Sequence, residues 1–149
     1  MAKKNNKPKV RKEPSPKKQP KAAYNPTSYN HLRPSWRISK IEMIGPYGWG
    51  NIDATTLKYI HDKLSNFESM TWNDILVKNK RNNHSVEIDK LSSTAQTRLT
   101  EIQLDDIDEL VSLRLSAKER IWGILEQGVL IILWWDPNHQ VCPSNLKHT

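Results

Sequence analysis

The sequence predicts an α+β fold in which N-terminal helices pack on a small antiparallel sheet, preceded by a disordered basic tail. Three observations predict this arrangement. The start of the chain is rich in lysine and proline, its middle repeats apolar residues on a helical period, and residues 106–142 show the patterns of β-strands. A chain of 149 residues is long enough for one modest domain, which we expect over residues 35–149.

The positive charge of the chain is concentrated at its N-terminal end. The formal net charge is +7, yet residues 1–37 hold 11 Lys and Arg residues and one acid, whereas residues 38–149 hold 12 basic residues and 15 acids. Residues 1–34 contain few aliphatic side chains and cannot offset the cost of ordering their backbone, so we expect a disordered tail. Dense lysines attract RNA, DNA or the ribosome through counterion release; a purely solubilising tail is the alternative.

Three helices are expected in the first part of the domain. Asp53 can cap a helix over residues 54–68, Thr71 with Asp74 resembles a capping box that starts a short helix, and Ser93 opens a third helix. Their apolar residues repeat on a period of about 3.6 and should face the core. These residues are Leu57, Ile60, Leu64, Phe67, Trp72, Ile75, Leu76, Ala95, Leu99 and Ile102.

A short strand near Trp36 and a glycine-rich loop at residues 45–50 precede these helices. The glycines of this loop do not match the spacing of a dinucleotide fingerprint or a phosphate-binding loop. We therefore expect Tyr47 and Trp49 to pack on the domain rather than to line a nucleotide site. The polar run at residues 78–84 is expected to be a loop.

After residue 105 the apolar period changes from 3.6 to 2, as in a half-buried strand. Val111, Leu113 and Leu115 share one face of this strand, and Arg114 lies on the other. Turns at residues 116–119 and 126–128 join it to strands over residues 120–125 and 129–135, and the latter is apolar on both faces. We expect residues 129–135 to be a central strand, with a last short strand at residues 140–142.

Composition excludes several classes of protein. The longest apolar run, Val129 to Trp135, has seven residues, far fewer than the roughly 20 of a membrane-spanning helix. The basic N-terminus has no apolar stretch behind it, unlike a secretory signal. One cysteine, Cys142, excludes an internal disulfide framework and is expected to be a buried thiol at the end of a strand. We expect a cytoplasmic protein with no membrane partner.

The strands carry a family resemblance. Residues 112–124 read SLRLSAKERIWGI, and residues 129–141, after a glycine turn, read VLIILWWDPNHQV. Helices followed by such a meander resemble the RelE/ParE superfamily, most closely the ParE-like toxins of bacterial type II toxin–antitoxin systems. The resemblance covers about residues 85–145, so that residues 36–80 would extend the minimal toxin domain. It implies a toxin that cleaves messenger RNA in the ribosome and a cognate antitoxin partner.

Cleavage of RNA requires groups that bind phosphate, stabilise a dianionic transition state and activate a ribose 2′-OH. Arg114, Lys118 and Arg120 come from two neighbouring strands and their turn and can supply the positive charge. His139 and His148 could transfer protons. No recognisable metal-ligand spacing is visible, so we expect a metal-independent endoribonuclease without a cofactor.

Other interpretations of these residues stay open. Arg114 and Arg120 could simply pair with nearby acids, Lys118 could be a solvated turn residue, and His139 could serve only the turn. Of Trp134 and Trp135, which point to opposite faces, one should be core and the other could stack on a base. Two other functions are considered: a non-catalytic ParE-like module that binds a protein such as a topoisomerase, and a nucleic-acid- or ribosome-associated accessory protein that binds through its tail.

Overall fold

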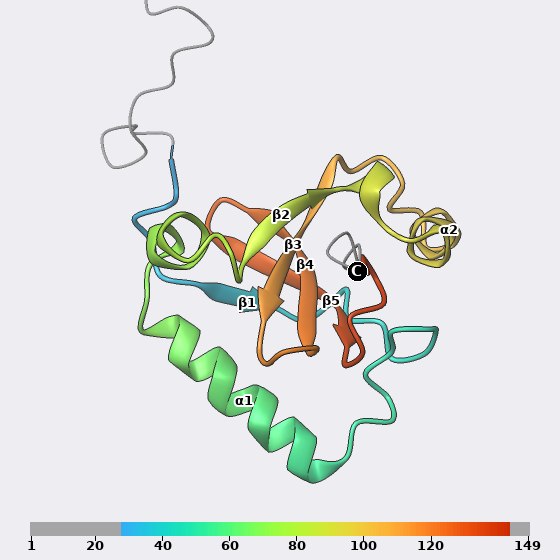
Figure 1. Cartoon of the computed structure of the whole chain (residues 1–149), viewed down its shortest axis with the longest axis horizontal. Helices are drawn as coiled ribbons and strands as arrows, with labels where there is room; N and C mark the ends of the chain where they lie inside the picture. The colour runs from blue at the N-terminus through green and yellow to red at the C-terminus, as the bar shows by residue number, and fades with distance from the viewer. Residues whose placement is uncertain (1–27, 144–149) are drawn as a thin grey trace, which may run out of the picture.

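The fold is α+β. The computed structural model describes residues 28–143 (Figure 1). None of the helices in this range is both long enough and apolar enough to cross a membrane. The elements are β1 (Ser35–Arg37), α1 (Ala54–Glu68), the π-helix η2 (Asn73–Lys78), β2 (His84–Glu87), the 3-10 helix η3 (Ile88–Lys90), α2 (Ser93–Glu101), β3 (Glu109–Arg114), β4 (Arg120–Glu126) and β5 (Val129–Asp136).

The strands form one mixed five-stranded sheet in the order β1-β5-β4-β3-β2. Strands β2 to β5 pair antiparallel, but β1 pairs parallel with β5, so the expectation of a purely antiparallel sheet is wrong at that edge. The apolar run at residues 129–135 is an internal strand, as predicted, because β5 lies between β1 and β4. Its residues from Leu130 to Trp135 are all buried.

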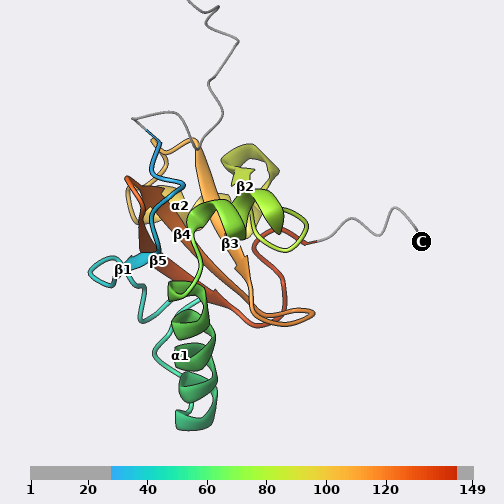
Figure 2. The same cartoon turned by 90° about the vertical axis from the view of Figure 1, so that its left-hand side faces the viewer.

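Each face of the sheet carries its own apolar core. On one face, Ile60 of α1 packs with Trp72 and Ile75 against the sheet. The sheet residues of this core are Val111, Leu113, Leu115, Ile121 and Trp135. Leu110, Trp122 and Trp134 pack with Ala95 and Leu99 of α2 on the other face. The two helices accordingly lie apart, α1 along the lower side of the molecule and α2 towards the opposite end of β3 (Figures 1 and 2).

The predicted helices form, with corrections in detail. The side chain of Asp53 accepts a hydrogen bond from Thr56 N at 2.7 Å, and Thr71 and Asp74 make the reciprocal bonds of a capping box. The third helix is capped by Ser92, one residue before the expected Ser93. Leu57, expected in the core, is 51% exposed. The apolar face of α1 therefore contacts the core mainly with Ile60, and Leu64 and Phe67 are partly buried beside it.

The glycine-rich loop packs on the end of β5, as expected. Tyr47 and Trp134 stack at 5.0 Å between ring centroids, and Trp49 lies 6.3 Å from Trp135. Trp135 N donates to Tyr47 O at 3.0 Å. Glu42 fastens the loop further, because its carboxylate accepts hydrogen bonds from Arg98 of α2 and from Trp134 Nε1. The same loop thus joins β5 to α2.

Three segments differ from the sequence expectations. Residues 84–87, which begin with the last residue of the predicted loop, form the edge strand β2 beside β3. Residues 140–142 form no strand; Gln140 N and Val141 N instead donate to the buried carboxylate of Asp136. Residues 28–34, which we assigned to the tail, make specific contacts: Leu32 O accepts from Trp72 N at 2.9 Å. The remainder of the predicted tail, residues 1–27, lies outside the described residues.

A basic pocket as the candidate active site

A pocket of about 700 Å³ opens on the face of the sheet that α2 covers only in part. Strands β2, β3 and β4 supply its floor, and the turn after β5 supplies one wall. This basic pocket is lined by Arg81, Asn82, His84, Val86, Lys90, Ser112, Arg114, Arg120, Trp122, His139, Cys142 and Pro143. Six of these side chains are arginine, lysine or histidine, and none is a carboxylate. The electrostatic potential of the pocket therefore favours an anion.

Arg114 and Arg120 come together by strand pairing, because they are directly opposite each other in the β3–β4 register. Arg114 is exposed and donates through Nε to Ser116 O at 3.1 Å and through Nη1 to Asn82 Oδ1 at 3.2 Å. The described part of the chain contains no ion pair with either arginine within 4.0 Å. Pairing with Glu109 or Glu119, the alternative considered above, is therefore not what holds them.

Arg120 shapes the turn between the two strands. Its side chain is only 8% exposed and donates to three carbonyl oxygens of the turn, those of Ser116, Ala117 and Glu119, at 2.8, 3.3 and 3.0 Å. Burial, together with the neighbouring charge of Arg114, lowers the pKa of Arg120. Arg120 contributes charge to the pocket while it fixes the turn, whereas Arg114 is the more accessible donor.

His139 enters the pocket from the turn after β5. Its backbone is in the left-handed region at φ 56°, and its side chain is partly buried. Burial and then the charge of Arg120 lower the pKa of His139, against the opposing effect of Asp136. At neutral pH this imidazole is therefore largely unprotonated and can accept a proton.

Asp136 positions this turn without facing a ligand. Its carboxylate is 1% exposed and accepts hydrogen bonds from Trp122 Nε1 at 3.1 Å, Gln140 N at 2.8 Å and Val141 N at 2.9 Å. These bonds curl residues 137–142 back over the end of β4, so that His139 and Cys142 both line the pocket. Sequence analysis placed the turn here, and the carboxylate explains its shape.

Sequence analysis missed three of the basic side chains that line the pocket, namely Arg81, His84 and Lys90. His84 begins β2, and Arg81 precedes it; both belong to the polar run that was expected to be a loop. Strand β2 contains a single buried residue, Val86, so that it lacks the alternation that identifies a strand. The only available signal was the spacing of His84 and Val86, which places both side chains on one face of a strand.

Other predicted site residues do not join the pocket. Lys118 is exposed in the turn between β3 and β4 and is not among the lining residues. His148 lies outside the described residues. Trp134 and Trp135 do face opposite sides of β5, and at 0% and 6% exposure both belong to the core, so that the alternative in which one of them stacks on a base does not hold.

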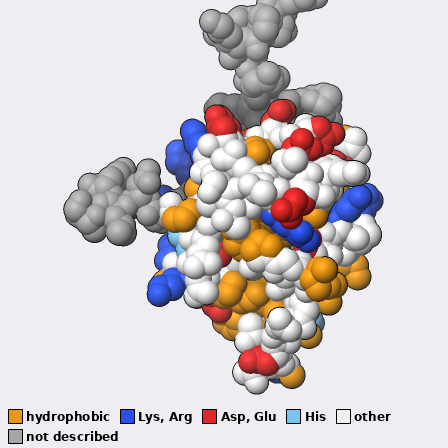
Figure 3. Space-filling model, turned by 90° about the vertical axis from the view of Figure 1, so that its right-hand side faces the viewer, with side chains coloured by type: hydrophobic (Ala, Val, Ile, Leu, Met, Phe, Trp, Pro, Cys, Tyr) orange, Lys and Arg blue, Asp and Glu red, His pale blue; other side chains and the backbone are white. Residues whose placement is uncertain are grey.

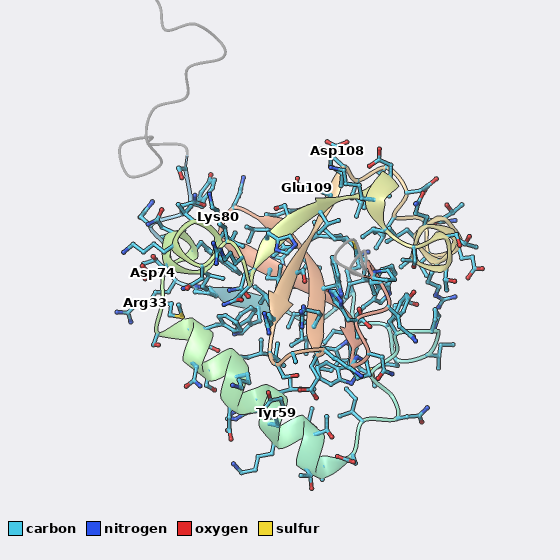
Figure 4. All side chains as sticks on the ribbon, viewed as in Figure 1. Arg33, Tyr59, Asp74, Lys80, Asp108 and Glu109 are labelled. Atoms are coloured by element: carbon cyan, nitrogen blue, oxygen red, sulfur yellow. The ribbon has the colours of Figure 1, made fainter. Side chains whose placement is uncertain are left out.

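Charge is segregated along β2 and β3. At the end away from Arg114, a groove of about 530 Å³ is lined by five acids, namely Glu87, Asp89, Asp105, Asp108 and Glu109. Asp108 and Glu109 lie at the top of Figure 4, and acidic side chains gather at the upper edge of the face in Figure 3. A polyanion is therefore drawn to the Arg114 end of the strands and repelled from the other end.

The pocket can hold an anion and move a proton. The described residues contain no group of three or more His, Cys, Asp or Glu side chains placed to hold a metal ion. Positive charge and imidazole groups suit a phosphodiester. Comparisons of the chain with protein-family models, with curated proteins and with solved structures give no significant match.

Proposed function

We propose that this protein binds RNA in the basic pocket and cleaves it there. The observation that carries the proposal is the convergence of Arg114, Arg120 and His139 in one pocket with no carboxylate in its lining. A phosphodiester is the anion that such a pocket suits, since guanidinium groups bind phosphate through charge-assisted hydrogen bonds.

In the proposed reaction the ribose 2′-OH attacks the adjacent phosphorus. His139 accepts the 2′-OH proton, because its lowered pKa leaves it unprotonated at neutral pH. Arg114, exposed beside it, donates to the phosphate oxygens as negative charge develops. Arg120 adds charge from the turn that it fixes, and so acts mainly by positioning.

We further propose that the protein is the toxin of a type II toxin–antitoxin system, acting on messenger RNA in the ribosome and neutralised by a cognate antitoxin. The support for this is the RelE/ParE-like sequence over residues 112–141 together with the basic pocket. A non-catalytic ParE-like module would not need proton-transfer groups beside its arginines. Two histidines line the pocket together with Arg114, which favours the ribonuclease.

The test measures RNA cleavage by the purified protein and growth arrest on its induced expression. We expect Arg114→Ala to lower the cleavage rate by about 30- to 1,000-fold, since one donor to a developing dianion contributes about 2–4 kcal/mol. The melting temperature should hardly change, because Arg114 is exposed. Arg120→Ala should lower both activity and stability, because three carbonyl oxygens lose their donor.

Arg33→Ala is the matched control. Arg33 is exposed, is not among the residues that line the pocket, and is labelled at the left of Figure 4. The Arg33→Ala variant should cleave RNA and arrest growth like the native protein. A folded Arg114→Ala variant that cleaves RNA at the native rate would contradict the proposed site. If the native protein cleaves no RNA but still arrests growth, the ParE-like alternative gains support.

A further inference from the structure

The basic pocket contains a second histidine on the side opposite the turn after β5. We propose that His84 is the general acid of the reaction and protonates the leaving 5′ oxygen, an inference that rests on the proposed RNA cleavage. Transfer of a phosphoryl group from one oxygen to another needs one group that takes a proton and one that gives it. The proposed function assigns only the first of these roles.

The structure fixes His84 relative to the phosphate-binding arginine. His84 pairs with Ser112 in the β2–β3 register, two residues before Arg114 on the same face of β3. The preceding asparagines hold this end of β2 in place: Asn83 Oδ1 accepts from Arg114 N at 2.9 Å, and Asn82 Oδ1 accepts from Arg114 Nη1 at 3.2 Å. Any phosphate bound by Arg114 therefore lies near His84.

The two histidines approach the pocket from different elements. His84 comes from the edge strand β2, and His139 from the turn that follows β5, on the far side of β3 and β4. They are close enough for the charge of His84 to affect the pKa of His139. An in-line displacement needs its base and its acid on opposite sides of the phosphorus, and two groups that flank an arginine pair can meet this requirement.

The remaining proton carriers of the pocket fit the role less well. Burial raises the pKa of the Cys142 thiol, so that it holds its proton more firmly. A general acid works best when its pKa lies near the working pH, which is a property of imidazole. The other charged and titratable groups that line the pocket with His84 are Arg81, Lys90, Arg114, Arg120, His139 and Cys142.

His84 and His139 line the same pocket from different elements, so that one can give a proton while the other takes one. The lowered pKa of His139 favours it as the base, and His84 is then placed to act as the acid. Neutral His139 takes the 2′-OH proton while O2′ forms a bond to phosphorus. The bond between phosphorus and O5′ breaks, and protonated His84 gives its proton to O5′. The products are a 2′,3′-cyclic phosphate and a 5′-hydroxyl, and the total number of protons on the two histidines is unchanged.

The test compares two substrates that differ only in their need for an acid. One is an RNA oligonucleotide, and the other is a uridine 3′-phosphodiester with a 4-nitrophenyl leaving group, which departs without protonation. We expect His84→Gln to lower cleavage of the oligonucleotide by about 10²- to 10⁴-fold while cleavage of the 4-nitrophenyl ester stays within about threefold of the native rate. His139→Gln should impair both reactions, because the 2′-OH must lose its proton in each.

His61→Gln is the matched control, since His61 is exposed on α1 and its side chain is 76% accessible. It should leave both reactions at the native rate. A His84→Gln variant that is unimpaired on both substrates, or equally impaired on both, would overturn the assignment while the proposed cleavage stands. A native protein inactive on both substrates would overturn the proposed function and this assignment with it. Thermal unfolding checks the fold, and His84→Asn is a second variant.

Discussion

Asp136 is the residue on which the shape of the pocket depends most directly. It is buried, lies opposite Arg120 in the β4–β5 register, and accepts three hydrogen bonds. Two of these come from the backbone of the turn that carries His139. The carboxylate therefore acts on the pocket through the path of the chain.

Replacing Asp136 by alanine should lower the free energy of unfolding by about 3 kcal/mol, because three N–H groups, two of them in buried hydrogen bonds, lose their acceptor. Asp136→Asn should cost less, since the amide oxygen can still accept. Denaturant unfolding measures both effects. Asp106→Ala, at an exposed position, should stay within about 0.5 kcal/mol of the native protein. A stable Asp136→Ala variant would show that the turn is held by other contacts.

The histidine of this turn gives a pH dependence with a definite sign. The pKa of His139 is lowered in the folded protein, so that the unfolded chain takes the proton more readily. Well above about pH 6.5 both states are neutral there and His139 contributes nothing to the pH dependence. As the pH falls from about 6.5, the free energy of unfolding should decrease until the pH passes the folded-state pKa.

We expect His139→Asn to lose less stability than the native protein between about pH 7 and about pH 5.5. Asparagine tolerates the left-handed backbone of this position, so the fold should be kept. Urea unfolding at the two pH values gives the comparison. If the free energy of unfolding falls equally in both proteins, protonation of His139 does not destabilise the fold.

At the scale of elements, the hairpin of β4 and β5 depends on two glycines for different reasons. The pairing of Glu126 with Val129 leaves a two-residue turn, Gln127-Gly128, in which both residues have positive φ. Gly123 instead lies inside β4 beside the register shift, where a Cβ atom would stand 2.5 Å from Ile131 O. One glycine serves a backbone conformation and the other a close approach of two strands.

Alanine at Gly123 should be the more damaging substitution, because its contact is a backbone carbonyl that cannot move without disturbing the ladder. We expect Gly123→Ala to cost about 2–3 kcal/mol and Gly128→Ala about 1–2 kcal/mol. Thermal unfolding of the two single variants ranks them. The reverse order would mean that the turn conformation, rather than the close approach, limits the hairpin.

The elements that sequence analysis predicted are those with local signals. The cap at Asp53 and the capping box of Thr71 identify their helices, and the two-faced apolar run identifies β5. Strand β2 has one buried side chain, and the parallel partner of β1 is distant in sequence, so neither pairing has a local signature. His84 was missed for that reason, whereas Arg114, Arg120 and His139 lie on or next to strands that the sequence identified.

At the scale of the whole molecule, positive and negative charge are separated between the two ends of β2 and β3. The basic pocket and the acidic groove lie at opposite ends of β2 and β3, and residues 1–27 add nine Lys and Arg residues to the chain. The lining of the pocket determines the chemistry. The basic N-terminal segment can add affinity that does not depend on base sequence.

Deleting residues 1–27 should weaken RNA binding and flatten its salt dependence, because fewer counterions are released. The maximal rate of cleavage at saturating RNA should stay close to that of the full chain. Titrations with a fluorescent single-stranded RNA at several salt concentrations measure how steeply the binding constant falls with salt. Complete loss of cleavage at saturating RNA would favour the accessory protein whose main contact is the tail.

The parallel pairing of β1 with β5 has a consequence for how the protein is made. β1 leaves the ribosome before Val129 to Ile131, against which it pairs, and most of the described chain lies between them. The turn that carries His139 comes later still. During translation the arginines of β3 and β4 can meet in a local hairpin while the sheet still lacks a strand and the pocket a wall. A ribonuclease built in this order would remain inactive on the ribosome that synthesises it until nearly all of its fold had emerged.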